Sequence, residues 1–204
     1  MPVHRLTGVF RIMDSPQIIL ASASPRRREL LDQIGVTYRV NPVDIDETPL
    51  EGEGPEEYVI RVAADKSAQA WRQSDKQLPV LSADTAVVLD DIIMGKPKNK
   101  AEAVDMLSRL SGATHLVFSA VSLRGKRHWR ILNKTEVTFR ILTQSEIISY
   151  WRTGEPEDKA GAYAIQGLGG LFVRKIVGSF SGVVGLPLFE TANLLSKAGI
   201  TILK

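Results

Sequence analysis

The chain has 204 residues, of which 44% are hydrophobic and 24% charged, as in globular proteins that form one core or two small lobes. The absence of cysteine excludes disulfides and thiolate metal sites, and no apolar run reaches the roughly 18 residues of a membrane helix. The net charge is +3, and the basic residues do not form the dense face typical of duplex-binding proteins. We therefore expect a cytoplasmic protein with no membrane and no specific nucleic acid as partner, for which anionic small molecules are candidate ligands.

The first 16 residues are predicted to be an N-terminal extension to a single domain of residues 17–204. The beginning of the chain has no uninterrupted apolar core of the kind that a signal peptide needs. Met13 stands just before the first strand-like run. Residues 1–12 are therefore either a misassigned start or a disordered segment.

Strand-like and helix-like segments alternate in the first half of this domain, and a hairpin follows in the middle. Apolar runs bounded by turn residues predict strands, and Ser-Pro, Asn and Thr-x-x-Glu signals predict helix starts. The predicted strands are 17–21, 36–43, 80–89, 114–123, 129–142, 171–177 and 200–203, and the predicted helices are 25–34, 55–74, 99–111, one opening at 143–146, and 187–198. This order predicts an α/β fold with a mixed, twisted sheet flanked by helices.

The strand predicted at 80–89 carries an aspartate, Asp84, among residues that are almost all Val, Leu or Ala. Such a strand is typically covered on both faces. A carboxylate there loses its hydration, which is costly unless another group compensates the charge. Asp84 therefore needs a metal, a cationic partner or a catalytic task.

A second candidate lies where the first strand meets the first helix, in the segment Ser22–Arg27. Free backbone donors at a helix N-terminus bind anions, phosphate in particular, and Ser and Arg side chains add donors. The arginines stand in the first helical turn, where the helix dipole disfavours cations unless an anion is bound. The alternative is an ordinary capped helix with solvated arginines, and the pattern alone leaves both interpretations open.

Two lysines are candidates for contact with phosphate. Lys66 falls on the apolar stripe of the predicted helix 55–74, so its amine either points inward or snorkels out along the rim. Lys96 lies in the loop that follows the Asp84 strand, and lysine is a compact, mobile point charge. Taken alone, Lys66 is equally well explained by a side chain that snorkels to solvent, and Lys96 is better explained by an ordinary polar loop.

Two further loops carry polar groups. The carboxylates of residues 44–47 suit Mg²⁺ or Mn²⁺, although a solvated acidic loop explains them too. Gln166, in the glycine-rich segment 154–170, offers one hydrogen-bond donor and one acceptor. Together with the lysines, the arginines and Asp84, these groups are the ingredients of metal-assisted phosphoryl chemistry.

The motifs that contain these candidates resemble those of the Maf-like nucleoside triphosphate pyrophosphatases, in the same order and over about residues 17–203. They are Leu20–Arg27, Ser82–Thr85, Gly95–Pro97, Leu107–Gly112 with His115, Asp158–Tyr163 and Val184–Pro187. The segment with Gln166 resembles the branch that acts on dTTP and UTP. The resemblance implies two lobes with a cleft between them, and hydrolysis of a nucleoside triphosphate to the monophosphate and pyrophosphate. It further implies a house-cleaning role with a link to division arrest, and it is compatible with a homodimer.

The resemblance also implies a role for each matching residue. Asp84 matches the proton acceptor, and Arg26, Thr85 and Gln166 match the positions tied to substrate choice. The positions expected to bind phosphate or line the cleft are Ser22, Ser24, Arg27, Lys66 and Lys96. Glu47 matches a further polar position of the cleft, and we hypothesise that it helps to hold a divalent cation, Mg²⁺ or Mn²⁺. Asp84 is the candidate second ligand, and the sequence leaves open whether it acts as base, as metal ligand or as both.

A second class of function fits the same residues. An anion-binding fold of this kind would also serve a nucleotide-sensing regulator of septum formation without significant catalysis. The two hypotheses differ in whether pyrophosphate is released from a nucleoside triphosphate. The presence of Asp84, Lys66 and Lys96 together favours the enzyme.

Overall fold

The computed structural model describes residues 15–203. Most of the extension predicted at residues 1–16 therefore lies outside the described residues. The strands are β1 (Ile18–Leu20), β2 (Tyr38–Val40), β3 (Val80–Leu89), β4 (Ile92–Met94), β5 (Thr114–Arg124), β6 (His128–Phe139) and β7 (Val173–Val177). The helices are α1 (Pro25–Gln33), α2 (Pro55–Gln73), α3 (Lys100–Leu110), α4 (Gln144–Trp151), α5 (Phe180–Val184) and α6 (Leu188–Lys197), with 3₁₀ turns η1 (Ala160–Ala162) and η2 (Leu168–Phe172). Within the described part of the chain, no helix is both long and apolar enough to cross a membrane.

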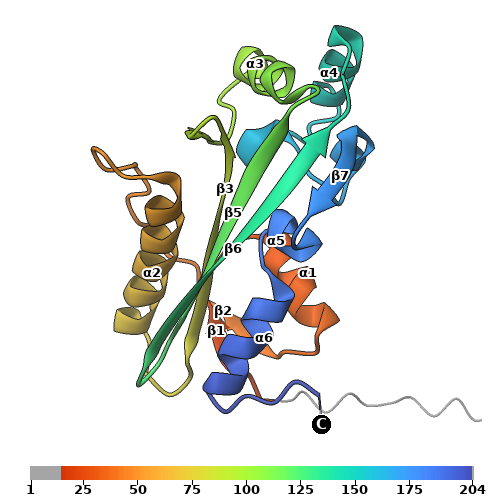
Figure 1. The fold of residues 1–204 in the computed structure, drawn as a ribbon. Helices are drawn as coiled ribbons and strands as arrows, with labels where there is room; N and C mark the ends of the chain where they lie inside the picture. Colours follow the sequence, from red (N-terminus) through yellow and green to blue (C-terminus); the bar gives the residue numbers. More distant parts are fainter. Residues whose placement is uncertain (1–14, 204) are drawn as a thin grey trace, which may run out of the picture.

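The strands form one mixed sheet in the order β2-β1-β3-β5-β6-β7, with β4 paired to the edge of β3. β1 runs parallel to β2 and β3, and the other pairs are antiparallel. The long strands β3, β5 and β6 form the spine of the molecule, with α2 on one side and α1, α5 and α6 on the other (Figure 1). The predicted α/β fold with a mixed sheet flanked by helices is confirmed.

The two faces of β3 carry different apolar clusters, as its almost continuous hydrophobic sequence predicts. Val59 and Ala63 of α2 pack against Ala86 and Val88 of β3. The larger cluster on the opposite face includes Leu194 of α6. Because successive residues of a strand face opposite sides, residues 82, 84, 86 and 88 share the α2 face.

The sheet has a gap beside the middle of β3. β1 pairs with β3 only at Val80 and Leu81, and β4 pairs with the same edge only from Val87 to Leu89. The edge between these two short partners has no paired strand among residues 15–203, while β5 covers the other edge throughout. Asp84 lies in the centre of this gap, so a ligand can approach the strand there from the side.

Several predicted boundaries differ from the observed ones for physical reasons. The strand predicted at 36–43 is only Tyr38–Val40, and Pro42, which has no N–H, stands two residues beyond it. The strand predicted at 200–203 is not formed. The amide of Ile200 instead donates to the carbonyl of Leu195 and closes the C-terminus of α6.

Two elements were not predicted because each is very short. Strand β4 follows a turn at Asp90 and Asp91, and both aspartates have positive φ, which suits the tight turn of a hairpin. Helix α5 is five residues long and is capped by Ser179, whose hydroxyl accepts from the amide of Gly182 at 3.0 Å. The predicted caps at Asn99 and Thr143 are confirmed.

His115 of β5 is buried and makes the stability of the fold depend on pH. Its Nε2 is 2.9 Å from the hydroxyl of Tyr163, and its Nδ1 has no partner within the described residues. Burial lowers the pKa of His115 to about 4, from an ordinary value of 6.5. As the pH falls, the unfolded chain therefore binds this proton before the folded protein does. The free energy of unfolding has its full value, as far as His115 is concerned, above pH 6.5, and it decreases progressively toward pH 4.

We expect the free energy of unfolding to fall by about 2 kcal/mol between pH 7 and pH 5 through this histidine alone. Urea unfolding at both pH values should show that loss in the wild-type protein. In His115→Asn the loss should be smaller by the same amount, because the other titrating groups are unchanged. Equal losses in the two proteins would contradict the assignment.

Candidate active site

A cavity of about 520 Å³ opens at the gap in the sheet. On one side it is bounded by the β1–α1 turn, the loop after β2, helix α2 and the end of α5. On the other side it is bounded by β4, the loop after it, and residues 158–166. This arrangement confirms the predicted cleft between two groups of elements. The predicted site residues that line the cavity are Ser22, Ser24, Arg26, Arg27, Glu47, Lys66, Asp84, Thr85, Lys96 and Gln166.

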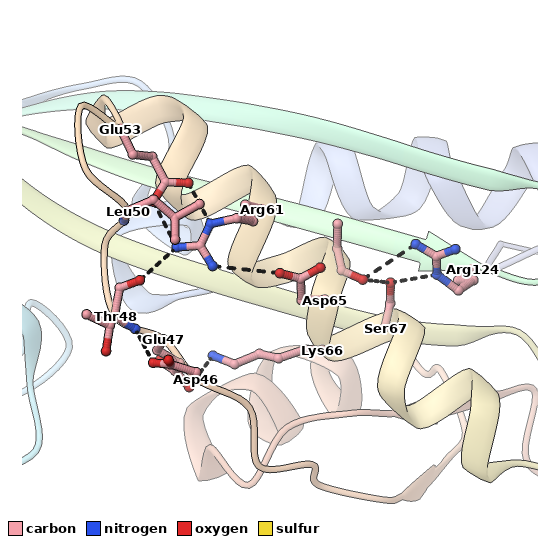
Figure 2. Close-up of polar contacts among 11 residues, drawn as sticks. Asp46, Glu47, Thr48, Leu50, Glu53, Arg61, Asp65, Lys66, Ser67 and Arg124 are labelled. Carbon is pink, nitrogen blue, oxygen red and sulfur yellow. Dashed lines mark hydrogen bonds and ion pairs between the residues drawn. The ribbon is translucent and has the colours of Figure 1, made fainter.

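The buried carboxylate of Asp84 has a lysine as its partner. Lys66 Nζ, on α2, lies 2.9 Å from Asp84 Oδ1 and 2.9 Å from Glu47 Oε1. Figure 2 shows the Lys66 side chain extending from α2 to Glu47. Of the two positions that the sequence left open, the amine therefore takes the inward one. One ammonium group is shared by two carboxylates of the cavity wall.

Burial and charge act in opposite directions on Asp84. Asp84 is 6% exposed. Burial raises its pKa above the ordinary value, and the nearby cations Lys66 and Arg27 offset only part of that shift. A carboxylate with a raised pKa is a better proton acceptor than an ordinary aspartate, and the cations beside it favour its charged form.

The start of α1 differs in one respect from its sequence signature. Pro25 is the first helical residue, as predicted, but the hydroxyl of Ser24 makes no capping bond to the described part of the helix. Ser22 Oγ instead accepts from the amide of Ser24 at 3.2 Å and from the guanidinium of Arg27 at 3.0 Å. The Ser24 hydroxyl at the cavity wall is therefore not engaged in a capping hydrogen bond.

The two arginines of α1 are held by segments that are distant in sequence. Arg27 Nε donates to the carbonyl of Gly185, at the end of α5, at 2.9 Å. Arg26 lies 3.7 Å from Asp158, across the cavity. The interpretation of both arginines as solvated is therefore wrong. Arg27 also donates to Ser22 Oγ, so its guanidinium group lies beside the turn that starts α1. The anion-binding interpretation of this segment stays a prediction.

Thr85 projects from the side of β3 opposite to Asp84. Its hydroxyl is 2.9 Å from the hydroxyl of Ser119 on β5, which in turn donates to the carbonyl of Gly182 at 2.7 Å. Sequence reasoning did not assign Ser119 to the site. The signal that could have found it is the pairing of the two strands, in which Ser119 lies directly opposite Thr85.

Tyr58 is a cavity residue that sequence reasoning missed. It precedes Lys66 by two helical steps of four residues, so both lie on one face of α2, and this spacing was a usable signal. Burial, followed by the charges of Asp84 and Glu47, raises the pKa of Tyr58 to about 12. Its hydroxyl is therefore protonated at neutral pH and can donate a hydrogen bond into the cavity.

The loop that carries Glu47 is fastened to α2 by an arginine. Arg61 donates to Glu53 at 2.6 Å and to the carbonyl of Thr48 at 3.1 Å, and Asp46 accepts from the amide of Thr48 at 2.9 Å. Figure 2 shows these contacts beside the Lys66–Glu47 pair. The carboxylate of Glu47 is thereby held at the mouth of the gap.

Only part of a metal site is present in the protein itself. Within residues 15–203, no group of three or more His, Asp or Glu side chains could hold a metal ion. Glu47 and Asp84 supply two hard oxygen donors that share Lys66 as partner. Mg²⁺ is often bound by one or two carboxylates together with substrate phosphates. The donor set fits a divalent ion that arrives with a phosphorylated ligand.

The fold and the site together define an α/β protein with a cavity in which a helix start, several cations and a buried carboxylate converge. The chain belongs to the Maf-like protein family, which matches residues 17–198.

Relatives of this chain share about half of its residues. It is 56% identical to the dTTP/UTP pyrophosphatase of Methylococcus capsulatus over 90% of this chain and 92% of that protein. It is 54% identical to the dTTP/UTP pyrophosphatase of Pseudoalteromonas atlantica, over 90% and 97%. It is 51% identical to the protein of the same name from Escherichia coli O157:H7, over 88% and 91%.

Solved structures are more distantly similar. A nucleoside-triphosphatase, or dITP/XTP pyrophosphatase, from Mycobacterium abscessus has a TM-score of 0.46 and 14% identity over 89% of this chain and 93% of that one. The Ham1 protein of Staphylococcus aureus has a TM-score of 0.43 and 19% identity over 60% and 71%. The family assignment rests on the family match and the relatives above.

Proposed function

We propose that this protein is a nucleoside triphosphate pyrophosphatase that hydrolyses dTTP and UTP to the monophosphate and pyrophosphate. One observation carries the proposal above the others. The buried Asp84 is held by Lys66 at the open edge of β3, inside a cavity that is also lined by the start of α1. A carboxylate with a raised pKa beside a cationic, phosphate-sized site suits attack of water on phosphorus.

The triphosphate lies in the cavity with its phosphates at the start of α1. Backbone amides of the first helical turn and the hydroxyls of Ser22 and Ser24 donate to phosphate oxygens. Arg26 and Arg27 add charge-assisted donors, and a bound anion offsets their unfavourable position in the helix dipole. Lys66 and Lys96 neutralise the charge that builds on the leaving pyrophosphate.

Asp84 accepts the proton of the water that attacks phosphorus. Lys66 donates to Oδ1 of this carboxylate, and that contact also fixes the orientation of its other oxygen. Glu47 and Asp84 would hold Mg²⁺ or Mn²⁺ together with substrate phosphates. A divalent ion bound there supplies further neutralisation of phosphate charge.

Base choice follows from the hydrogen-bonding groups of Gln166. Uracil and thymine present an acceptor beside a donor, and the amide of Gln166 can bond both groups at once. Cytosine presents the opposite pattern at those two positions. Together with Arg26 and Thr85, Gln166 therefore favours dTTP and UTP over CTP.

Replacement of Gln166 by Ala is expected to lower the preference for UTP over CTP about 10-fold, which corresponds to the loss of one or two hydrogen bonds. The quantity to measure is the ratio of kcat/KM for the two substrates. Asn193→Ala, on the exposed side of α6, serves as the matched amide control. A ratio in Gln166→Ala equal to that of the wild type would remove Gln166 from this role.

A panel of triphosphates tests the proposal as a whole. Each of dTTP, UTP, CTP, ATP and GTP is incubated with the protein and Mg²⁺ or Mn²⁺, and pyrophosphate release is followed. The proposal expects release from dTTP and UTP in preference to the others. Tight binding of nucleotides without release from any of them would favour the nucleotide-sensing regulator of septum formation.

The remaining expectations belong to the same proposal. A house-cleaning role with a link to division arrest, a cytoplasmic location, a homodimer and the absence of a specific nucleic-acid partner stay predictions. None of them enters the chemistry described above.

A further inference from the structure

Gln166 sits at the tip of a tight turn. The amide of Gly167 donates to the carbonyl of Ala164 at 3.1 Å, which closes the turn around Gln166. The Gln166 side chain is exposed and lines the cavity. Whether its amide meets a base therefore depends on how firmly the backbone on each side of the turn is held.

Two side chains outside the cavity hold that backbone. The Tyr150 hydroxyl, on α4, accepts from the amide of Ala164 at 3.0 Å and donates to Glu155 at 2.6 Å. The Glu155 carboxylate also accepts from the amides of Leu168 and Gly169, each at 3.0 Å. The pair thus binds the residue two before Gln166 and the residues two and three after it.

Two glycines of the turn leave the space that this pair occupies. A Cβ atom at Gly167 would lie 2.3 Å from a carboxylate oxygen of Glu155. A Cβ atom at Gly169 would lie 2.7 Å from the hydroxyl of Tyr150. Any side chain at either position would displace one member of the pair, so the glycines and the pair form one unit.

The protonation states of the pair suit this arrangement. Burial tends to raise the pKa of Glu155, but the hydrogen bonds from Tyr150, Gly169 and Leu168 outweigh it and lower the pKa overall. Burial, with the hydrogen bond to Glu155, raises the pKa of Tyr150. At neutral pH, Glu155 is therefore an acceptor of three hydrogen bonds, and Tyr150 remains a donor to it.

We propose that Tyr150 and Glu155 are positioning residues for base selection, which fix the backbone on both sides of Gln166 and so hold its amide toward the base. Neither lines the cavity. The inference rests on the proposed function, because it assigns a consequence to the Gln166 contact. If the turn is loosened, a smaller fraction of molecules presents Gln166 in the binding position, and affinity falls by that fraction.

The loss should fall on uracil and thymine nucleotides. CTP does not use the Gln166 contact, so its kcat/KM should change little. The chemical step should also be preserved, because Asp84 and Lys66 lie on β3 and α2. The expected signature is a higher KM for UTP, a nearly unchanged kcat, and a lower UTP-to-CTP ratio.

The experiment compares Tyr150→Phe and Glu155→Gln with the wild-type protein. Tyr150→Phe keeps the ring, which packs edge-on against Phe172 with ring centroids 4.9 Å apart, so the core is retained. Tyr38→Phe on β2 and Glu136→Gln on the exposed side of β6 are matched controls. We expect each test variant to lower the ratio of kcat/KM for UTP and CTP about 5- to 10-fold, and each control to leave it unchanged.

A second measurement is independent of activity. Amide hydrogen exchange of a peptide that covers residues 164–169, without nucleotide, should be faster in both test variants than in the wild type, because three amides lose or weaken their acceptor. If the wild-type protein hydrolyses no triphosphate, the proposed function fails. The exchange measurement still tests whether Tyr150 and Glu155 hold the backbone around Gln166. The inference is overturned by unchanged exchange, or by faster exchange with an unchanged substrate ratio.

Discussion

Asp84→Asn is expected to lower the turnover of UTP about 10²- to 10⁴-fold, the usual contribution of a positioned general base. The side chain keeps its shape and can still accept a hydrogen bond from Lys66. The loss therefore isolates the ability to take a proton. Initial rates of pyrophosphate release from purified protein provide the measurement, and Asp105→Asn on the exposed side of α3 is the matched control. Turnover near that of the wild type would remove Asp84 from the mechanism.

The same variant should not be destabilised. A carboxylate whose pKa is raised by burial contributes stability below its ordinary pKa of 3.8, and that contribution is lost as the pH rises through the raised value. Above that raised value, the buried charge of Asp84 is therefore a cost to the free protein. A Tm of Asp84→Asn at or above that of the wild type agrees with this account, and a marked decrease in Tm contradicts it.

Lys66→Met is expected to lower turnover about 10²- to 10³-fold, because a cation that stabilises developing charge is removed. It should also change the pH profile. Activity of the wild type should rise with pH as Asp84 loses its proton, and Lys66 lowers the pKa of Asp84. In the variant that rise should move to higher pH.

Lys100→Met, on the exposed first turn of α3, controls for the loss of a charge elsewhere. The dependence of kcat/KM on pH is measured for all three proteins with the same substrate. A lower rate in Lys66→Met with the rise at an unchanged pH would mean that Lys66 contacts substrate without influencing Asp84. That result would contradict the inference that the ion pair with Lys66 tunes the pKa of Asp84.

The sequence was sufficient to select Asp84 and Lys66 but not to pair them. An aspartate in an apolar strand is recognisable because burying its carboxylate costs desolvation free energy. A lysine on an apolar helical stripe is recognisable by its spacing from the apolar residues. Their contact depends on α2 crossing the face of β3 that carries Asp84. The gap between β1 and β4, which admits a ligand, depends on two strands of three residues each, and such short elements leave little pattern in a sequence.

The turn around Gln166 shows a second limit. Gln166 itself was found by resemblance, but Tyr150 and Glu155 were not. Their side chains hydrogen-bond to backbone amides. Nearly every residue has such an amide, so the residue types in the sequence do not show which ones are bound. Glycines at 167 and 169 permit close approach of another group, but a glycine does not specify that the group is a tyrosine–glutamate pair.

The expectation for Ser24 illustrates why a local signature can mislead. Ser followed by Pro predicts a capped helix start, and α1 begins there as predicted. The hydroxyl that organises the turn is that of Ser22, which bonds to Arg27 as well. Because Arg27 is oriented by the carbonyl of Gly185, far along the chain, the local sequence could not contain this information.

The products of UTP hydrolysis test the central claim most directly. The wild-type protein is incubated with UTP and Mg²⁺ or Mn²⁺, and the nucleotide and phosphate products are separated by ion-exchange chromatography. The account predicts UMP and pyrophosphate in equal amounts, and about 10²- to 10⁴-fold less of both when Asp84→Asn replaces the wild type over the same period. Formation of UDP and orthophosphate, or binding of UTP with no product, would contradict it.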